Sequence, residues 1–523
     1  MVILRRCSWW CLLLVLVLSG SRLAAASREE RTFLAANADF QARMWGQAER
    51  DFDQFIRNYR HSTNLPLAVL LKAQAQYQQQ KYPAVITLLS AHQAGAGPLA
   101  DQYQEWIAES HFAASNYPAA AAAYRALARN YPASPAALSA EVRSAAAYEK
   151  LGDWAALSTL LGDTNSLFVK KAAVDAANEL VQRGRLLLAQ AGYEQNDYGA
   201  AAAQLAAIDP STLKPGLDWQ YHYLLCRVRL AAGELDAALS VAATLNQIAQ
   251  LKKDDAWRAE SVSLQAEVLE KLGRVEEAIN AYRLNLAAGV PEVRQGEAIW
   301  KIAALSAWLG HFSEAEAILG RFLDQFPGSA QVPIAQLSVG ELQLKEFLAQ
   351  GNTNQLAAAA ESFNALLRKY PEGGLAGKAT LDRGWCQWLA GNLPAAWEDF
   401  NRARQSRLAP TERALAQFKV GDVLLAQKDY AGALTNYRAI LADPAATEWQ
   451  ERAAYQSLRC NLALANTNGA AADFARIAGQ FVHGTFTPGS VLLYGESLGQ
   501  PAEARALFTR LLPQLAGDRL TPE

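Results

Sequence analysis

The sequence predicts an all-α solenoid built from about thirteen helix hairpins. Three observations support this prediction: a repeat of about 37 residues that runs through most of the chain, small side chains at constant places in each repeat, and spacings of three and four residues between apolar groups. Such spacings place side chains on one face of a helix. Self-similarity at this period is typical of stacked two-helix units.

Each repeat contains a turn followed by an anchor residue that is mostly large and apolar. Aligned on this anchor, the thirteen repeats lie 34 to 44 residues apart, most often 37. The anchors are Trp45, Tyr82, Tyr117, Trp154, Tyr198, Leu235, Val275, Phe312, Leu356, Leu393, Tyr430, Thr467 and Pro501. Several anchors follow an Asp or Asn, whose side chain can cap the free amides of a helix that begins there. These residues are Asn116, Asp153, Asp197 and Asp429.

The residue three places after the anchor is apolar in every repeat, and in eleven of thirteen repeats it is Ala. The clearest are Ala48, Ala120, Ala201, Ala238, Ala278, Ala315, Ala359, Ala396 and Ala433. Four places later follows a larger side chain, such as Tyr124 or Phe400, and nine places before the anchor lies another small group, such as Ala303 or Gly384. Because closely approaching helices leave room only for small side chains between their axes, each repeat is expected to be two antiparallel helices.

This pattern closely resembles the tetratricopeptide repeat (TPR) family over residues 33–512. The small residues, the anchor and the Ala recur in nearly every unit, and aromatic-Pro pairs close several units at 131–132, 326–327 and 370–371. The resemblance implies a right-handed α-superhelix whose first helices line a concave groove that binds protein partners. The units depart from the family in their length, in the missing Trp near their start, and in Leu458 and Leu492, which replace the small residue of the last two.

A narrower resemblance concerns the runs 131–136 and 326–330. They are similar to aromatic-Pro-x-Ser junctions of bacterial envelope repeat proteins, of the outer-membrane assembly lipoprotein type and the Tol-Pal-associated periplasmic type. Cys7 and Cys11 do not follow a lipidation motif, which argues against the first type.

Two intervals between anchors reach 44 residues. The first contains the polar run 162–166, where we expect a bend between an N-terminal array at 27–162 and a main array at 163–512. The second is expected to hold a longer turn at 349–355 within one repeat. Residues 513–523 are expected to form a C-terminal tail.

The first 26 residues have the pattern of a secretory signal peptide. Arg5 and Arg6 precede a short apolar stretch, and small residues up to Ala26 fit a cleavage site. About ten apolar residues are too few for the roughly 20 that a transmembrane helix needs. The mature chain is therefore expected in the periplasm or beyond, and the alternative is an uncleaved N-terminal anchor.

Composition excludes several classes of protein. The chain has 49 Lys and Arg against 51 Asp and Glu, so a strongly basic nucleic-acid binder is excluded. Hydrophobic residues make up 51% of the chain, which excludes disorder. Cys226, Cys386 and Cys460 are too scattered for a disulfide framework, and their redox state stays open.

The sequence gives no support for catalysis. The G-x-S-x-G match at 495–499 and the Gly-rich run at 373–378 are both predicted to lie among helices, without the strand that a nucleophile elbow or phosphate loop needs. The six His residues fall in different repeats without metal-ligand spacing. No catalytic residue, cofactor or metal is therefore predicted.

Aromatic residues mark a candidate partner surface. In the family register, Trp300, Trp308, Trp385 and Trp388 point into the groove, and Trp is enriched at binding hot spots. The alternative is that these rings fill gaps between neighbouring repeats. Four further rings occupy the place of Trp388 in other repeats and strengthen either interpretation: Phe40, Tyr77, Phe112 and Tyr193.

The sequence therefore predicts a non-catalytic scaffold whose groove binds a helical or extended segment of a cell-envelope protein. The first alternative is the helical domain of a cell-wall enzyme such as a lytic transglycosylase, which would need a separate catalytic domain. The second is an assembly factor anchored to the membrane by a retained signal segment.

Overall fold

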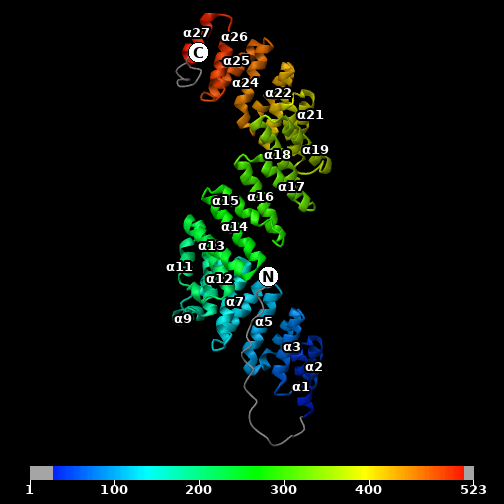
Figure 1. Cartoon of the computed structure of the whole chain (residues 1–523), viewed down its shortest axis with the longest axis vertical. Coiled ribbons are helices and arrows are strands. Elements are labelled where there is room, and N and C mark those ends of the chain that lie inside the picture. The colour runs from blue at the N-terminus through cyan, green and yellow to red at the C-terminus, as the bar shows by residue number, and fades with distance from the viewer. Residues whose placement is uncertain (1–26, 512–523) are drawn as a thin grey trace. The chain divides into compact units, whose positions relative to one another are not determined.

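The computed structural model describes residues 27–511, and this range is all-α with no strand (Figure 1). The predicted signal peptide at 1–26, with Cys7 and Cys11, and the predicted tail at 513–523 lie outside the described residues. The chain divides between Lys252 and Lys253 into two compact units. The bend expected after Gly162 falls inside the first unit.

The first unit contains six helix hairpins, one additional α-helix and three short 3-10 helices. Its elements are α1 (Arg28–Gln41), α2 (Trp45–Asn58), α3 (Leu65–Gln78), α4 (Tyr82–His92), η1 (Gln93–Gly95), η2 (Gly97–Leu99), α5 (Ala100–Ala113), α6 (Tyr117–Asn130), α7 (Ala137–Leu151), α8 (Trp154–Gly162), α9 (Leu167–Val174), α10 (Glu179–Glu194), α11 (Tyr198–Ala206), η3 (Pro210–Thr212), α12 (Pro215–Ala231) and α13 (Leu235–Lys252).

The second unit contains seven hairpins as far as the described residues extend. Its elements are α14 (Asp255–Lys271), α15 (Val275–Leu284), α16 (Glu292–Trp308), α17 (Phe312–Gln325), α18 (Val332–Gln350), α19 (Thr353–Lys369), α20 (Ala376–Leu389), α21 (Leu393–Ala403), α22 (Pro410–Ala426), α23 (Tyr430–Ala442), α24 (Thr447–Ala463), α25 (Thr467–Gln480), α26 (Thr487–Ser497) and α27 (Pro501–Leu511).

The predicted hairpin register is confirmed. Twelve of the thirteen second helices begin at the anchor residue that the sequence pattern assigned, and α19 begins three residues before its anchor, Leu356. The predicted caps are present as well, since the side chains of Asn116, Asp153, Asp197 and Asp429 each accept a hydrogen bond from a backbone amide in the first turn. Side-chain capping therefore fixes where several of the second helices begin.

The longer turn expected at 349–355 is wrong. α18 extends to Gln350 and α19 begins at Thr353, so the additional residues lengthen both helices and leave a turn of two residues. Gly351 ends α18 with a φ of 72°, a backbone conformation that glycine adopts without strain. The side chain of Asn352 then caps α19 by accepting a hydrogen bond from the amide of Asn354.

The polar run after Gly162 leads into a helix that the repeat pattern did not predict. This helix, α9, contacts α7, α8 and α10. Phe168 fixes it in two ways. Its backbone amide donates to the buried carboxylate of Glu141 at 2.7 Å, and its ring fills the space beside Gly184. A short insertion outside the 37-residue register carries no periodic signal, which is why the sequence indicated only a bend.

The core of each hairpin forms where a small residue faces a large one. The nine recurring Ala residues of the second helices are all fully buried. On the first helices, a Cβ added to Gly384 would lie 2.8 Å from the ring of Phe400, and one added to Gly421 would lie 2.6 Å from the ring of Tyr437. Since real Cβ atoms do not come so close to a ring, the glycines permit this helix spacing.

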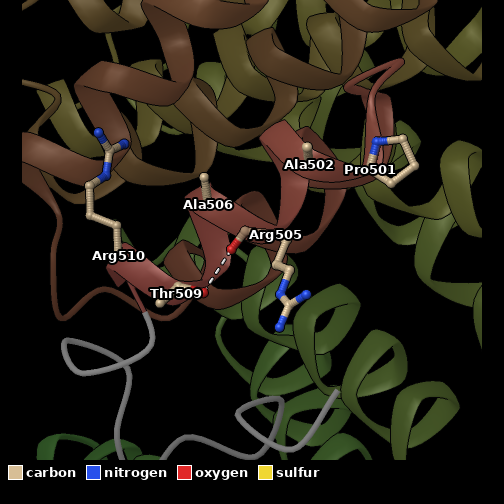
Figure 2. A pocket seen from close by; sticks show the side chains of 6 residues that line it. All are labelled: Pro501, Ala502, Arg505, Ala506, Thr509 and Arg510. Atoms are coloured by element: carbon tan, nitrogen blue, oxygen red, sulfur yellow. Dashed lines mark hydrogen bonds between the residues drawn. The ribbon is translucent and has the colours of Figure 1, made fainter.

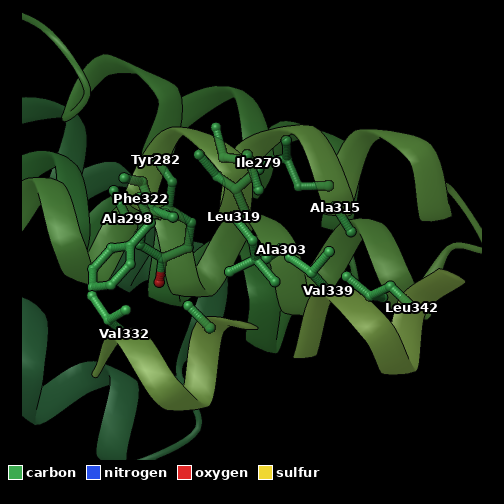
Figure 3. Close-up of a cluster of buried hydrophobic side chains, with 14 of the residues drawn as sticks. Ile279, Tyr282, Ala298, Ala303, Ala315, Leu319, Phe322, Val332, Val339 and Leu342 are labelled. Atoms are coloured by element: carbon green, nitrogen blue, oxygen red, sulfur yellow. The ribbon is translucent and has the colours of Figure 1, made fainter. Parts of the chain in front are cut away.

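Hairpins join through shared clusters of buried side chains. Figure 3 shows one such cluster in the second unit, where residues from α15, α16, α17 and α18 pack together. Its members include Ile279, Tyr282, Ala298, Ala303, Ala315, Leu319, Phe322, Val332, Val339 and Leu342. Each hairpin therefore depends on its neighbours for the burial of its own apolar face.

The two helices of a hairpin form two layers. Consecutive first helices contact each other, as α1 and α3, α3 and α5, α18 and α20, α20 and α22, or α22 and α24 do. No pair of consecutive second helices in residues 27–511 has contacts of similar extent. The first helices therefore lie closer together, and we call them the inner helices. Within the same range, no helix combines the length and the apolar character that a membrane span requires.

Candidate partner-binding surface

A row of apolar side chains runs along the inner helices of the second unit. The position four residues after the small group holds Leu344 on α18, Trp388 on α20, Leu425 on α22 and Leu462 on α24. All four are half-buried, and each belongs to a different hairpin. We call these four residues the apolar row. Half-buried apolar side chains still expose some surface to water, and a docking partner can remove this surface from water.

The tryptophans of α16 have different surroundings. Trp308 is 73% exposed, the highest exposure among the four candidate tryptophans. Trp300 is half-buried against Phe322 of α17, with ring centroids 5.5 Å apart, and its Nε1 donates to Oε1 of Gln331 at 2.7 Å. Trp300 therefore packs on a ring of its own hairpin and donates to the residue just before α18, whereas Trp308 is largely exposed.

The tryptophans of α20 are half-buried beside a lysine of the next inner helix. The ammonium nitrogen of Lys419 lies 4.5 Å from the ring centroid of Trp385 and 5.6 Å from that of Trp388. Asp422 accepts a hydrogen bond from the same ammonium group at 2.7 Å. The structure thus joins Trp385 and Trp388 in one cluster with Lys419, and it does not bring them into contact with Trp300.

Sequence reasoning missed Lys419. It stands two places before the small group of its repeat, a position without a role in the expected groove, so nothing in the repeat register marked it. Cations over aromatic rings recur further along the same layer, where the guanidinium carbon of Arg452 lies 5.2 Å from the ring centroid of Trp449 and 5.6 Å from that of Phe486. Such contacts stabilise a cation most where water is partly excluded.

The other aromatic rings at the place of Trp388 pack within their own hairpins. Each packs against the anchor ring of its own hairpin, with centroids 5.2 to 5.7 Å apart. The pairs are Phe40 with Trp45, Tyr77 with Tyr82, Phe112 with Tyr117 and Tyr193 with Tyr198. Each of these contacts lies within one hairpin, and the four rings are half-buried, as the residues of the apolar row are.

Groups with possible reactivity are held in structural contacts. Cys226, Cys386 and Cys460 are buried thiols outside any disulfide of the described residues, and burial raises the pKa of Cys386 to about 12 and that of Cys460 to about 11. Lys378, in the Gly-rich run, donates to the carboxylate of Asp382 at 2.7 Å, and burial raises the pKa of Asp382 to about 6. Between residues 27 and 511, no three His, Cys, Asp or Glu side chains are placed so that they could hold a metal ion together.

A shallow depression of about 620 Å³ lies on α27, at the end of the described residues. Figure 2 shows its lining, which comes from this one helix: Pro501, Ala502, Arg505, Ala506, Thr509 and Arg510. Since no second element forms a wall, the depression is one exposed face of a helix. It lies apart from the apolar row, which belongs to α18, α20, α22 and α24, and it is no candidate site.

Comparison with known protein families gives matches over several segments. Residues 172–307 match a tetratricopeptide repeat-like domain, residues 83–135 and 344–412 match a tetratricopeptide repeat model, and residues 297–329 match another tetratricopeptide repeat model. The search of curated protein sequences gives no match.

The comparison with solved structures also gives matches, of which three are described. A tetratricopeptide repeat protein from Parabacteroides merdae has 17% identity, covers 49% of this chain and 91% of its own length, and has a TM-score of 0.31. The structure of Naa15/Naa10 bound to HypK-THB has 16% identity and a TM-score of 0.31, and the match covers 94% of this chain and 76% of the other. The APC/C hetero-tetramer Cut9-Hcn1 has 12% identity, with 95% of each chain covered and a TM-score of 0.29. TM-scores this low add nothing to the family matches.

The matched segments lie in both units, and hairpins in the same register continue between and beyond them. Proteins with such repeats are generally scaffolds for protein–protein interaction and are generally non-catalytic. The chain is therefore built from tetratricopeptide-type helical repeats.

Proposed function

We propose that the chain is an exported, non-catalytic scaffold that binds a helical or extended segment of a bacterial cell-envelope protein along the inner helices of its second unit. The observation that supports this proposal most is the apolar row, which places one half-buried apolar side chain on each of four consecutive hairpins. A segment with apolar groups at regular intervals can bury them one by one against such a row.

Trp308 adds to this surface. An indole that is 73% exposed on α16 can bury a large area on binding and lose little rotamer entropy. Its exposure also means that the hairpin core does not depend on it. Truncation of Trp308 should therefore weaken partner binding and leave the fold intact.

The binding surface is tested by photocrosslinking in the native envelope, with a benzophenone side chain at position 308, 388 or 397. We expect crosslinks to one common protein from positions 308 and 388, and none to that protein from 397, because Trp397 lies on the second helix α21. Trp308→Ala should then weaken binding of this protein about tenfold or more, as truncation of a hot-spot residue does.

Circular dichroism serves as the control for the Trp308→Ala protein, whose helix content should stay unchanged. Equal crosslinking from position 397, or binding that survives Trp308→Ala together with Trp388→Ala, would contradict the proposed surface.

Export is supported by residues 1–26, in which charged residues, an apolar stretch and small residues follow one another. An envelope role is supported by the aromatic-Pro-x-Ser runs at 131–136 and 326–330. N-terminal sequencing of the protein from the periplasmic fraction should give Ser27 as the first residue. A chain that retains its first 26 residues would favour the anchored alternative, and clearing on a peptidoglycan zymogram would contradict the non-catalytic role.

A further inference from the structure

Tyrosine occupies one position of the repeat in only three hairpins. The position is the large side chain of the second helix, seven residues after the anchor, and its tyrosines are Tyr124, Tyr282 and Tyr437. The other ten hairpins have a side chain without a hydroxyl: Phe52, Leu89, Leu161, Leu205, Ala242, Leu319, Phe363, Phe400, Phe474 and Phe508. Ring packing alone does not require the hydroxyl, because phenylalanine fills the same place elsewhere.

All three hydroxyls donate to a carboxylate on the inner helix of their own hairpin. Tyr124 donates to Glu109 at 2.7 Å. Tyr282 donates to Glu270 at 2.5 Å, and Tyr437 donates to Asp422 at 2.8 Å. Burial, the largest cause in each case, raises the pKa of the three tyrosines, so their hydroxyls stay protonated and donate at neutral pH.

The carboxylate in each case also binds a cation. Arg143, on the next inner helix α7, forms an ion pair with Glu109 and donates to the hydroxyl of Tyr124 at 3.2 Å. Lys301, on the next inner helix α16, donates to the two oxygens of Glu270 at 3.0 and 3.1 Å. In these two clusters, the cation connects one inner helix to the following one.

The third cluster connects its inner helix to the preceding one. Lys419 and Asp422 both lie on α22, and the cation reaches back over the rings of Trp385 and Trp388 on α20. The side chains of Lys419 and Asp422 are 14% and 11% exposed. Because water is largely excluded, the hydrogen bonds and cation–π contacts of this cluster are stronger than they would be on an open surface.

We propose that the three tyrosine–carboxylate–cation clusters are clamps that lock α5 to α7, α14 to α16 and α20 to α22, so that these pairs of hairpins move together. In an array where each hairpin contacts only its neighbours, the strength of each junction sets where the array yields. The third clamp would also hold Trp385 and Trp388 in a fixed position on the partner-binding side.

The test is hydrogen–deuterium exchange, read by mass spectrometry on the full chain with Tyr→Phe variants. Each variant keeps the ring and removes one donor, so amide exchange should become about three- to tenfold faster at the clamped junction, the effect of one lost hydrogen bond. The clamps differ in whether the loosened inner helix follows or precedes the hairpin of the substituted tyrosine. Tyr124→Phe should loosen α7, which follows its hairpin, and Tyr437→Phe should loosen α20, which precedes its hairpin.

Tyr430→Phe is the matched control, since Tyr430 lies on α23 with Tyr437 and no hydrogen bond of its hydroxyl is found among the described residues. It should leave exchange in α20 unchanged. Lys419→Met, which keeps Tyr437 and Asp422, should loosen α20 as Tyr437→Phe does. Exchange that is unchanged in α7 and α20, or that rises only within the hairpin of the substituted tyrosine, would overturn the proposal.

Discussion

Replacement of Phe400 by Ala will lower the local free energy of unfolding around α20 and α21 by about 3–5 kcal/mol. Phe400 is fully buried, and its ring fills the space that Gly384 leaves open on the facing inner helix. Because Gly384 has no side chain that could move into the cavity, the site cannot close around the missing ring. The variant therefore loses the free energy gained by burying the ring, and it also bears the cost of an unfilled cavity.

Trp397→Ala is the control for this prediction. Trp397 lies on the same helix, three residues before Phe400, and is 36% exposed, so its removal leaves no enclosed cavity. Both variants are compared by hydrogen exchange in α20 and α21, since unfolding of a long repeat array need not be two-state. Equal losses in the two variants would contradict the register that places Phe400 opposite Gly384.

The hairpin architecture could be predicted because the repeat makes the same packing solution visible many times. A single small residue such as Ala433 indicates little about helix packing. Its recurrence at a fixed distance from the anchor identifies the site where helices approach closely. Capping by Asp153 or Asp429 is also local in sequence, so the beginnings of these helices followed from the residues alone.

The features that the sequence did not reveal depend on residues outside the register. α9 is an insertion fixed by Phe168 against Glu141 and Gly184, and only the folded chain brings these three residues together. The position of Lys419 over Trp385 likewise depends on how far apart two inner helices lie. The register indicates which residues lie on the inner helices, but it does not indicate which side chains pair across hairpins.

Disruption of the ion pair between Arg383 and Asp399 will have the second large effect. Arg383 donates to both oxygens of Asp399 and to Oδ1 of Asn364 at 2.7 Å, which joins α19, α20 and α21. The two side chains are 19% and 8% exposed, so Asp399→Leu leaves the guanidinium without its anion in a place with little water. We expect a loss of about 3–5 kcal/mol in the local free energy of unfolding.

The double variant Arg383→Met with Asp399→Leu should recover most of this loss, because an apolar pair of similar volume leaves no buried charge. Glu361→Gln provides the contrast on α19. Its partner Arg368 is 65% exposed and Glu361 is 63% exposed, so water and salt screen the pair and its loss should leave stability unchanged within error. Hydrogen exchange in α20 and α21 distinguishes these outcomes. If the double variant were as unstable as Asp399→Leu alone, the pair would act through its exact hydrogen-bond geometry, which links three helices, and the penalty of an unpaired charge would not be the cause.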